Sequence, residues 1–169
     1  MRRVALLRGV NVGGKAKVVM PALKKVFEDL GARDVDTYIQ SGNVIFNAPA
    51  TLNAKKLETA IEKHFHLKVD VTLRTHAQLK ALVEENPYDD EVVHVGFLFA
   101  KPKKADLARV DAAKYEPEGF MVRGDDVYLH LPFGVGGSKG FMPHFTKRVG
   151  VPMTVRNWNT VKKLRDLSS

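Results

Sequence analysis

Two stretches of this chain resemble each other, TLRTHAQLKAL at residues 72–82 and TVRNWNTVKKL at residues 154–164. In an ungapped alignment a threonine, an arginine, a lysine and a leucine coincide, and leucine exchanges with valine at two further positions. Internal similarity of this kind is typical of a duplicated structural unit. The sequence therefore predicts two similar halves, and the elements upstream of each stretch can be compared.

The first half predicts a regular alternation of elements. In order these are a strand at 4–10, a helix in the segment 21–31 that starts with Pro21 and ends before Gly31, strands at 35–40 and 44–47 joined by a tight turn, a helix at 52–66 and a strand at 69–75. This βαββαβ order is that of the ferredoxin-like unit, a four-stranded antiparallel sheet with two helices on one face. A linking helix at 76–85 follows.

The second half repeats this order. It predicts a strand at 92–100, a short helix at 105–113, a hairpin of strands at 119–123 and 127–131, a helix at 140–149, a strand at 153–156 and a closing helix at 158–167. The predicted fold class is therefore α+β, a tandem duplication of a ferredoxin-like βαββαβ unit in which each copy is followed by an extra helix. We expect halves at 1–83 and 84–169.

Positive charge is concentrated near the two ends of the chain. Residues 1–27 and 127–165 each contain seven Lys or Arg and no Asp or Glu, whereas residues 28–126 contain 13 basic and 18 acidic residues. The whole chain of 169 residues has a formal net charge of +8. Because one-signed surfaces concentrate counter-ions, this segregation indicates an anionic partner.

Composition excludes several classes of chemistry. The chain has no cysteine, so it forms no disulfide, thiolate zinc site or iron–sulfur cluster. The apolar run at residues 4–7 is too short for a signal peptide core or a membrane span. His64 and His66 point in different directions at a helix end, which does not suit a metal site. We expect a cytoplasmic protein without membrane association, metal or cofactor.

Two glycine-rich loops are candidate anion sites. Residues 9–15, GVNVGGK, have the spacing of a P-loop, but Ala16 lacks the hydroxyl that binds magnesium, so nucleotide hydrolysis is not predicted. The turn beside Arg8 and Lys15 can still direct backbone N–H groups at an anion. The alternative is a tight connection whose lysine is merely solvated. Residues 134–140, GVGGSKG, repeat the theme with Lys139 ahead of a helix.

Three motifs resemble one protein family. LLRGVNVGGK at 6–15, YIQSGNVIF at 38–46 and TVRNWNT at 154–160 are similar to the bacterial family catalogued as domain of unknown function 1697. The likeness covers essentially the whole chain and implies a pair of ferredoxin-related α+β halves without an assigned reaction. If the motifs mark the family's site, the residues to consider are Arg8, Asn11, Gly13, Gly14, Lys15, Ser41, Asn43, Arg156, Asn157, Trp158 and Asn159.

These side chains suit a binding surface, because amides both donate and accept, tryptophan offers a stacking face and arginine a fork for phosphate. Each also has a structural alternative. Asn43 can form the hairpin turn, Asn157 can cap the last helix, and Trp158 can fill the interface between the halves.

Three functions remain open from the sequence. The first is a module that binds nucleic acid, RNA in particular, through phosphate contacts at the basic glycine-rich loops, as the sequence pI of about 9.7 favours. The second is an enzyme or sensor for a small phosphorylated or carboxylated metabolite, bound where the loop of Arg8 and Lys15 meets the 156–159 segment. The third is an interaction protein that forms a homodimer through its sheets.

Overall fold

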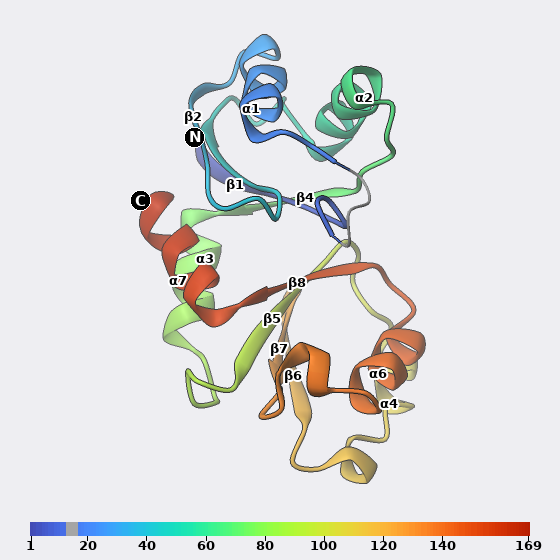
Figure 1. Ribbon diagram of the computed structural model, residues 1–169. Helices are drawn as coiled ribbons and strands as arrows, with labels where there is room; N and C mark the ends of the chain where they lie inside the picture. The colour runs from blue at the N-terminus through green and yellow to red at the C-terminus, as the bar shows by residue number, and fades with distance from the viewer. Residues whose placement is uncertain (13–16) are drawn as a thin grey trace. The chain divides into compact units, whose positions relative to one another are not determined.

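The structure, a computed structural model, describes residues 1–12 and 17–169 (Figure 1). It confirms the α+β class, with two four-stranded antiparallel sheets and seven α-helices among the described residues. The chain divides into two compact units, Met1–Val83 together with Lys162–Ser169, and Glu84–Val161. Each unit is described below by itself.

The first unit carries one sheet and two helices that cover it. In chain order its elements are β1 (Arg2–Leu7), α1 (Met20–Asp29), β2 (Arg33–Thr37), β3 (Asn43–Asn47), α2 (Ala54–Phe65), β4 (Val71–Thr75) and α3 (His76–Glu84). The strand order is β2-β3-β1-β4, and all neighbouring strands are antiparallel. Helices α1 and α2 lie on the same face of this sheet (Figure 1). The core between them includes Phe27 and Phe46, whose rings meet edge to face at 5.1 Å.

Two of the predicted strands are shorter than the sequence suggested. The strand expected at 4–10 ends at Leu7 because Gly9 and Asn11 turn the chain with positive φ angles of 69° and 56°. The strand expected at 35–40 occupies Arg33–Thr37, and Ile39 has a positive φ of 50°. Both differences arise at the turns that shape the candidate site.

The second unit repeats the strand arrangement. Its elements are β5 (Val93–Leu98), α4 (Lys104–Ala108), the 3-10 turn η1 (Ala112–Tyr115), β6 (Gly119–Arg123), β7 (Asp126–His130), the single-turn α5 (Gly134–Gly137), α6 (Phe141–Val149), β8 (Met153–Asn157) and the start of α7 (Trp158–Leu167). The strand order is β6-β7-β5-β8, again antiparallel. The helix expected at 105–113 is divided into α4 and η1. The core of this unit includes Leu129, Phe141 and Phe145.

The two similar stretches make the same hydrogen bonds. In β4, Arg74 Nη1 donates to Thr72 Oγ1 at 2.7 Å and to the Leu73 carbonyl at 2.8 Å. In β8, Arg156 Nη1 donates to Thr154 Oγ1 at 2.6 Å and to the intervening carbonyl at 3.1 Å. In both units a helix begins at the residue after the strand. The halves are therefore alike in hydrogen bonding as well as in element order.

The C-terminal residues belong to the first unit. His76 Nδ1 lies 3.0 Å from the Arg165 carbonyl and 3.1 Å from Ser168 Oγ, and Arg2 Nε donates to the Leu167 carbonyl at 3.0 Å. The sequence-based half 84–169 therefore differs from the observed unit in residues 162–169. Of the helices that the structure describes, none has both the length and the apolar character needed to cross a membrane.

Candidate functional site

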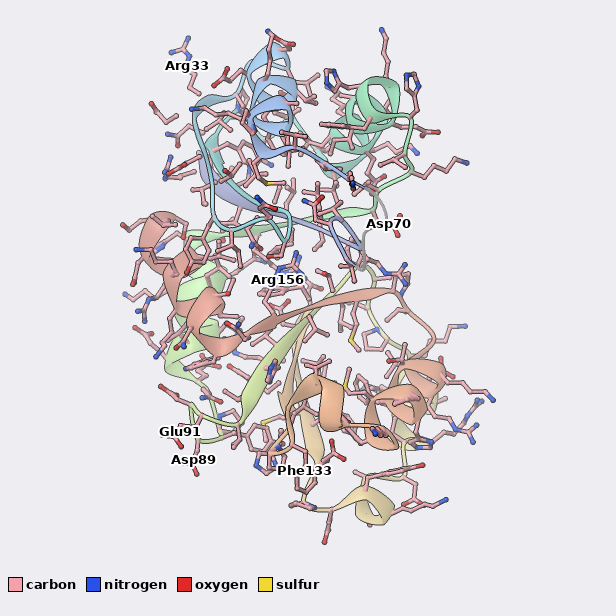
Figure 2. The ribbon with its side chains drawn as sticks, viewed as in Figure 1. Arg33, Asp70, Asp89, Glu91, Phe133 and Arg156 are labelled. Carbon is pink, nitrogen blue, oxygen red and sulfur yellow. The ribbon has the colours of Figure 1, made fainter. Side chains whose placement is uncertain are left out.

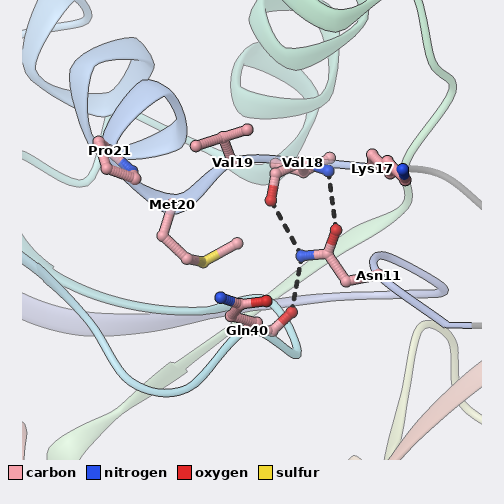
Figure 3. Close-up of a pocket in the computed structure, with 7 residues that line it drawn as sticks. All are labelled: Asn11, Lys17, Val18, Val19, Met20, Pro21 and Gln40. Carbon is pink, nitrogen blue, oxygen red and sulfur yellow. Dashed lines mark hydrogen bonds between the residues drawn. The ribbon is translucent and has the colours of Figure 1, made fainter. Parts of the chain in front are cut away.

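Asn11 closes the glycine-rich loop that follows β1. Its Nδ2 donates to the Val18 carbonyl at 2.9 Å and to the Gln40 carbonyl at 2.7 Å, and its Oδ1 accepts from the Val18 N–H at 2.9 Å (Figure 3). Both amide hydrogens are therefore already used within the protein. Asn11 can position the loop, but it has no free hydrogen to offer a ligand.

The turn between β2 and β3 packs directly on this loop. The Gly42 carbonyl accepts from the Leu7 N–H at 2.9 Å, and Gly42 has a positive φ of 83°. A Cβ at this position would lie 2.6 Å from Val10 Cγ2 and 2.8 Å from Leu7 Cβ. Only glycine fits both the backbone angle and the space. The first two sequence motifs are therefore held together at one corner of the first unit.

Asn43 and Ser41 support this turn from within. Asn43 is fully buried, and its Nδ2 donates to the Tyr38 carbonyl and to Ser41 Oγ, both at 2.9 Å. Buried amides of this kind stabilise a turn by satisfying its backbone groups. The structure thus shows the turn-forming contacts that the sequence offered as the alternative for Asn43.

A pocket of about 370 Å³ lies between the loop, the turn and the beginning of α1 (Figure 3). Its described lining consists of one cation, two amide side chains and a mostly apolar segment, namely Lys17, Asn11, Gln40, Val18, Val19, Met20 and Pro21. Lys17 is exposed. The pocket is therefore polar on one side and apolar on the other.

Helix α1 begins at this pocket without a cap. The N-cap residue Val19 makes no side-chain hydrogen bond, and the first turn contains no acidic residue. The N–H groups of Met20 and Ala22 have no acceptor within the helix, since the first donors of any α-helix lack one, and Pro21 has no N–H. Uncapped donors and the helix dipole favour an anion at this end.

Of the remaining candidates of the first unit that the structure describes, Arg8, Ser41 and Asn43 do not line this pocket. Arg8 is exposed and forms an ion pair with Asp70 at 3.2 Å, a solvent-exposed contact that contributes little stability. Asp70 lies on the segment before β4 (Figure 2). Gly13, Gly14 and Lys15 lie outside the described residues.

In the second unit, most side chains of the third motif are buried or form hydrogen bonds within the protein. Arg156, on β8 (Figure 2), is buried, and desolvation lowers the pKa of its guanidinium to about 10. Asn157 Oδ1 accepts from the Thr160 N–H at 2.8 Å, as an N-cap residue does. Trp158 is only 4% exposed, so it presents no open stacking face, whereas Asn159 is exposed.

The second glycine-rich loop differs from the first in its capping. Lys139 is exposed, as a binding cation would be. However, Ser138 is buried, and its Oγ accepts from the Met142 N–H at 3.1 Å in the first turn of α6. A protein hydroxyl thus satisfies one donor there, whereas the start of α1 has no such cap.

Of the seven residues that line the pocket only Asn11 was among the predicted site residues, and the two polar ones that were not predicted are Lys17 and Gln40. Lys17 follows the glycine-rich motif directly, and Gln40 lies inside the second motif. Pro21 marks the start of the helix in the sequence, and the first backbone N–H groups of a helix lack acceptors within it. Pro21 was therefore the signal that a helix N-terminus would lie close to these residues. What the sequence did not show is that the two motifs meet.

The fold and the pocket at the beginning of α1 together define the class of protein. It is an α+β protein of two similar units with a small, partly polar pocket beside a glycine-rich loop. The chain belongs to the family described as protein of unknown function (DUF1697), whose sequence model matches residues 1–128. This confirms the family that the motifs indicated; the first two motifs lie within the matched residues, and the third, at 154–160, lies beyond them.

A solved structure is similar over nearly the whole length. It is that of the conserved bacterial protein SP0830 from Streptococcus pneumoniae, with 25% sequence identity and a TM-score of 0.71. The match covers 99% of this chain and 98% of that chain. A comparison with curated proteins found no match.

Proposed function

We propose that the protein is an anion-binding module and that its site is the pocket at the beginning of α1. The observation that carries this proposal is the N-terminus of α1, which no described side chain caps and whose first turn has no acidic residue, and which opens onto a pocket lined by Lys17. An anion there would accept from the free N–H groups and neutralise the lysine.

The ligand that this pocket suits is a small phosphorylated or carboxylated metabolite. A volume of about 370 Å³ falls within the range of small-molecule sites. The apolar side formed by residues 18–21 can cover the body of such a ligand, while Lys17 and the start of α1 hold its charged group. Gln40 can add an amide contact that fixes orientation.

RNA is the second candidate, favoured by the absence of acidic residues from 1–27 and by the exposure of Arg8 and Lys17. Binding would run mainly through phosphates, because Phe27 and Phe46 of the first unit's core are fully buried and its other aromatic side chains, Tyr38 and Phe65, are half-buried. Such binding would have little sequence preference and would weaken steeply with salt.

The test compares Lys17→Glu with the control Lys101→Glu, which changes the charge equally at an exposed position of the second unit. We expect inorganic phosphate, pyrophosphate or citrate to raise the melting temperature of the wild type and the control but not of Lys17→Glu. All three proteins should melt alike without ligand. Equal stabilisation of all three would refute the proposed site.

The same variants distinguish the two ligand classes. Fluorescence anisotropy with a labelled single-stranded RNA of mixed sequence is measured at low and at physiological salt. Tight binding at low salt that collapses as salt rises, and that Lys17→Glu weakens, favours RNA. Small-anion stabilisation without RNA binding favours the metabolite.

We also propose that each unit is a ferredoxin-like unit and that the two arose by duplication. The orders β2-β3-β1-β4 and β6-β7-β5-β8 correspond strand for strand, which supports this proposal. The shared arginine–threonine hydrogen bonds of β4 and β8 support it independently, because chance similarity would not require them.

A further inference from the structure

A second concave surface of the first unit lies away from the pocket at the start of α1. It has a volume of about 530 Å³ and is lined by side chains of α2, by the N-cap residue of α2 and by Leu30, the residue that follows α1. Helices α1 and α2 lie on the same face of the sheet (Figure 1). Its lining combines one large apolar residue, one small one and three lysines, namely Leu30, Ala60, Lys55, Lys56 and Lys63, with Asn53 and Thr59. We call this surface the α1–α2 groove.

The floor of the groove is apolar. Leu30, the residue that follows α1, is 37% exposed, and Ala60 is half-buried against the core. Leu57 and Ile61 of α2 are fully buried, and residues 56, 60 and 63 lie on the side of the helix next to this buried face. The aliphatic stems of the lysines extend this apolar surface.

The rim is basic and unpaired. Lys55, Lys56 and Lys63 are exposed, and none has an ion-pair partner among the described residues. On α1, by contrast, Lys24 and Lys25 each face a carboxylate one turn away, at 4.0 Å and 2.9 Å. The three rim lysines are therefore free to meet an external carboxylate.

Both glutamates of α2 lie outside the groove. Glu58 and Glu62 line a different hollow together with Asp70 and with Lys55, which lines both hollows, and Glu58 Oε1 accepts from the Val71 N–H at 3.0 Å. None of the described residues that line the α1–α2 groove is acidic. A partner at the groove thus meets apolar surface, positive charge and the neutral polar side chains of Asn53 and Thr59, but no described acidic side chain.

We propose that the α1–α2 groove binds an acidic amphipathic helix of a partner protein. Lys56 and Lys63 are two turns apart on α2, about 10 Å along its axis. A helix lying alongside would meet them with carboxylates seven residues apart and would place apolar side chains between, over Leu30 and Ala60. This is the helix-in-groove mode of recognition, with charge complementarity at the rim.

Other occupants fit less well. The phosphate groups of a nucleic acid would pair with the lysines but would not cover Leu30 and Ala60. A second copy of the chain in a symmetric contact would bring the same patch opposite itself, and so would bring the rim lysines of both copies together. An acidic amphipathic helix satisfies both the floor and the rim.

The probe is a fluorescein-labelled peptide with two glutamates seven residues apart and leucines between them, and its control is a scrambled peptide of the same composition. We expect Ala60→Glu, and separately the double variant Lys56→Glu/Lys63→Glu, to weaken binding at least about tenfold by fluorescence anisotropy. The control Lys101→Glu/Lys103→Glu changes the net charge equally in the second unit and should retain binding.

Two further measurements separate the alternatives. Lys17→Glu should bind the peptide normally, since the groove does not depend on the anion pocket. The proposal is overturned if the scrambled peptide binds as well, if the Lys101→Glu/Lys103→Glu control loses as much affinity, or if sedimentation shows that Ala60→Glu converts a dimer to a monomer. If Ala60→Glu does not fold by circular dichroism, the lysine double variant decides.

Discussion

Replacing Gly42 with alanine tests how closely the turn between β2 and β3 packs on the loop after β1. Two costs add at this position. The positive φ of 83° costs an alanine about 1–2 kcal/mol, and forcing a Cβ to within 2.6 Å of Val10 Cγ2 adds about 1–3 kcal/mol of overpacking. The matched control is Gly31→Ala, at a positive φ of 90° with no atom within 4 Å of the new Cβ. It should lose only the first contribution.

Urea unfolding followed by far-UV circular dichroism measures the difference. With an m-value of about 2 kcal/mol/M, the midpoint of Gly42→Ala should lie about 0.5–1.5 M below that of Gly31→Ala. Gly42→Ala should also weaken small-anion binding, because the displaced loop carries Asn11, which lines the pocket. Equal midpoints for the two variants would refute the close packing on which this corner of the site depends.

Two more predictions concern the second unit. Trp158→Ala should cost about 3–5 kcal/mol in the free energy of unfolding, because the indole is buried, and a loss below about 1 kcal/mol by urea unfolding would contradict a core role. Burial lowers the pKa of His94, whose Nδ1 has no hydrogen-bond partner among the described residues. The unfolded state therefore binds the proton more readily, and stability is retained above pH about 6.5 and lost as pH falls below it. The melting temperatures measured near pH 7.5 and near pH 5 should differ less in His94→Leu than in the wild type or in His64→Leu, the control at an exposed histidine. The same pH dependence in all three proteins would disprove the role of His94 in the loss of stability at low pH.

Much of the fold could be predicted from the sequence because its signals are local. Pro21 and the glycine after residue 30 mark the ends of a helix, and Asn53, which accepts from the Lys56 N–H at 3.0 Å, marks the start of another. The repeated segment at 72–82 and 154–164 predicted two similar halves. Errors arose where a single residue adopts an unusual backbone angle, as Ile39 does, since hydrophobic patterns do not encode positive φ.

The candidate site could be predicted only in part. Arg8, Asn11, Ser41 and Asn43 were chosen for their hydrogen-bonding groups, yet the structure uses Asn11 and Asn43 to hold the loop and the turn. Trp158 was considered as a stacking face and is buried. Residue type alone does not reveal whether a polar group is already satisfied within the protein.

The sequence by itself determined the α+β class, the repeat, the family and the separation of charge along the chain, because each depends on the order of residues. Tertiary structure decided which motifs meet. It placed residues 7–11 against residues 40–43, left the start of α1 uncapped beside Lys17, and set Leu30 next to the lysines of α2. These features depend on contacts between residues far apart in the chain, whose geometry is fixed only when the sheet pairs and the core packs.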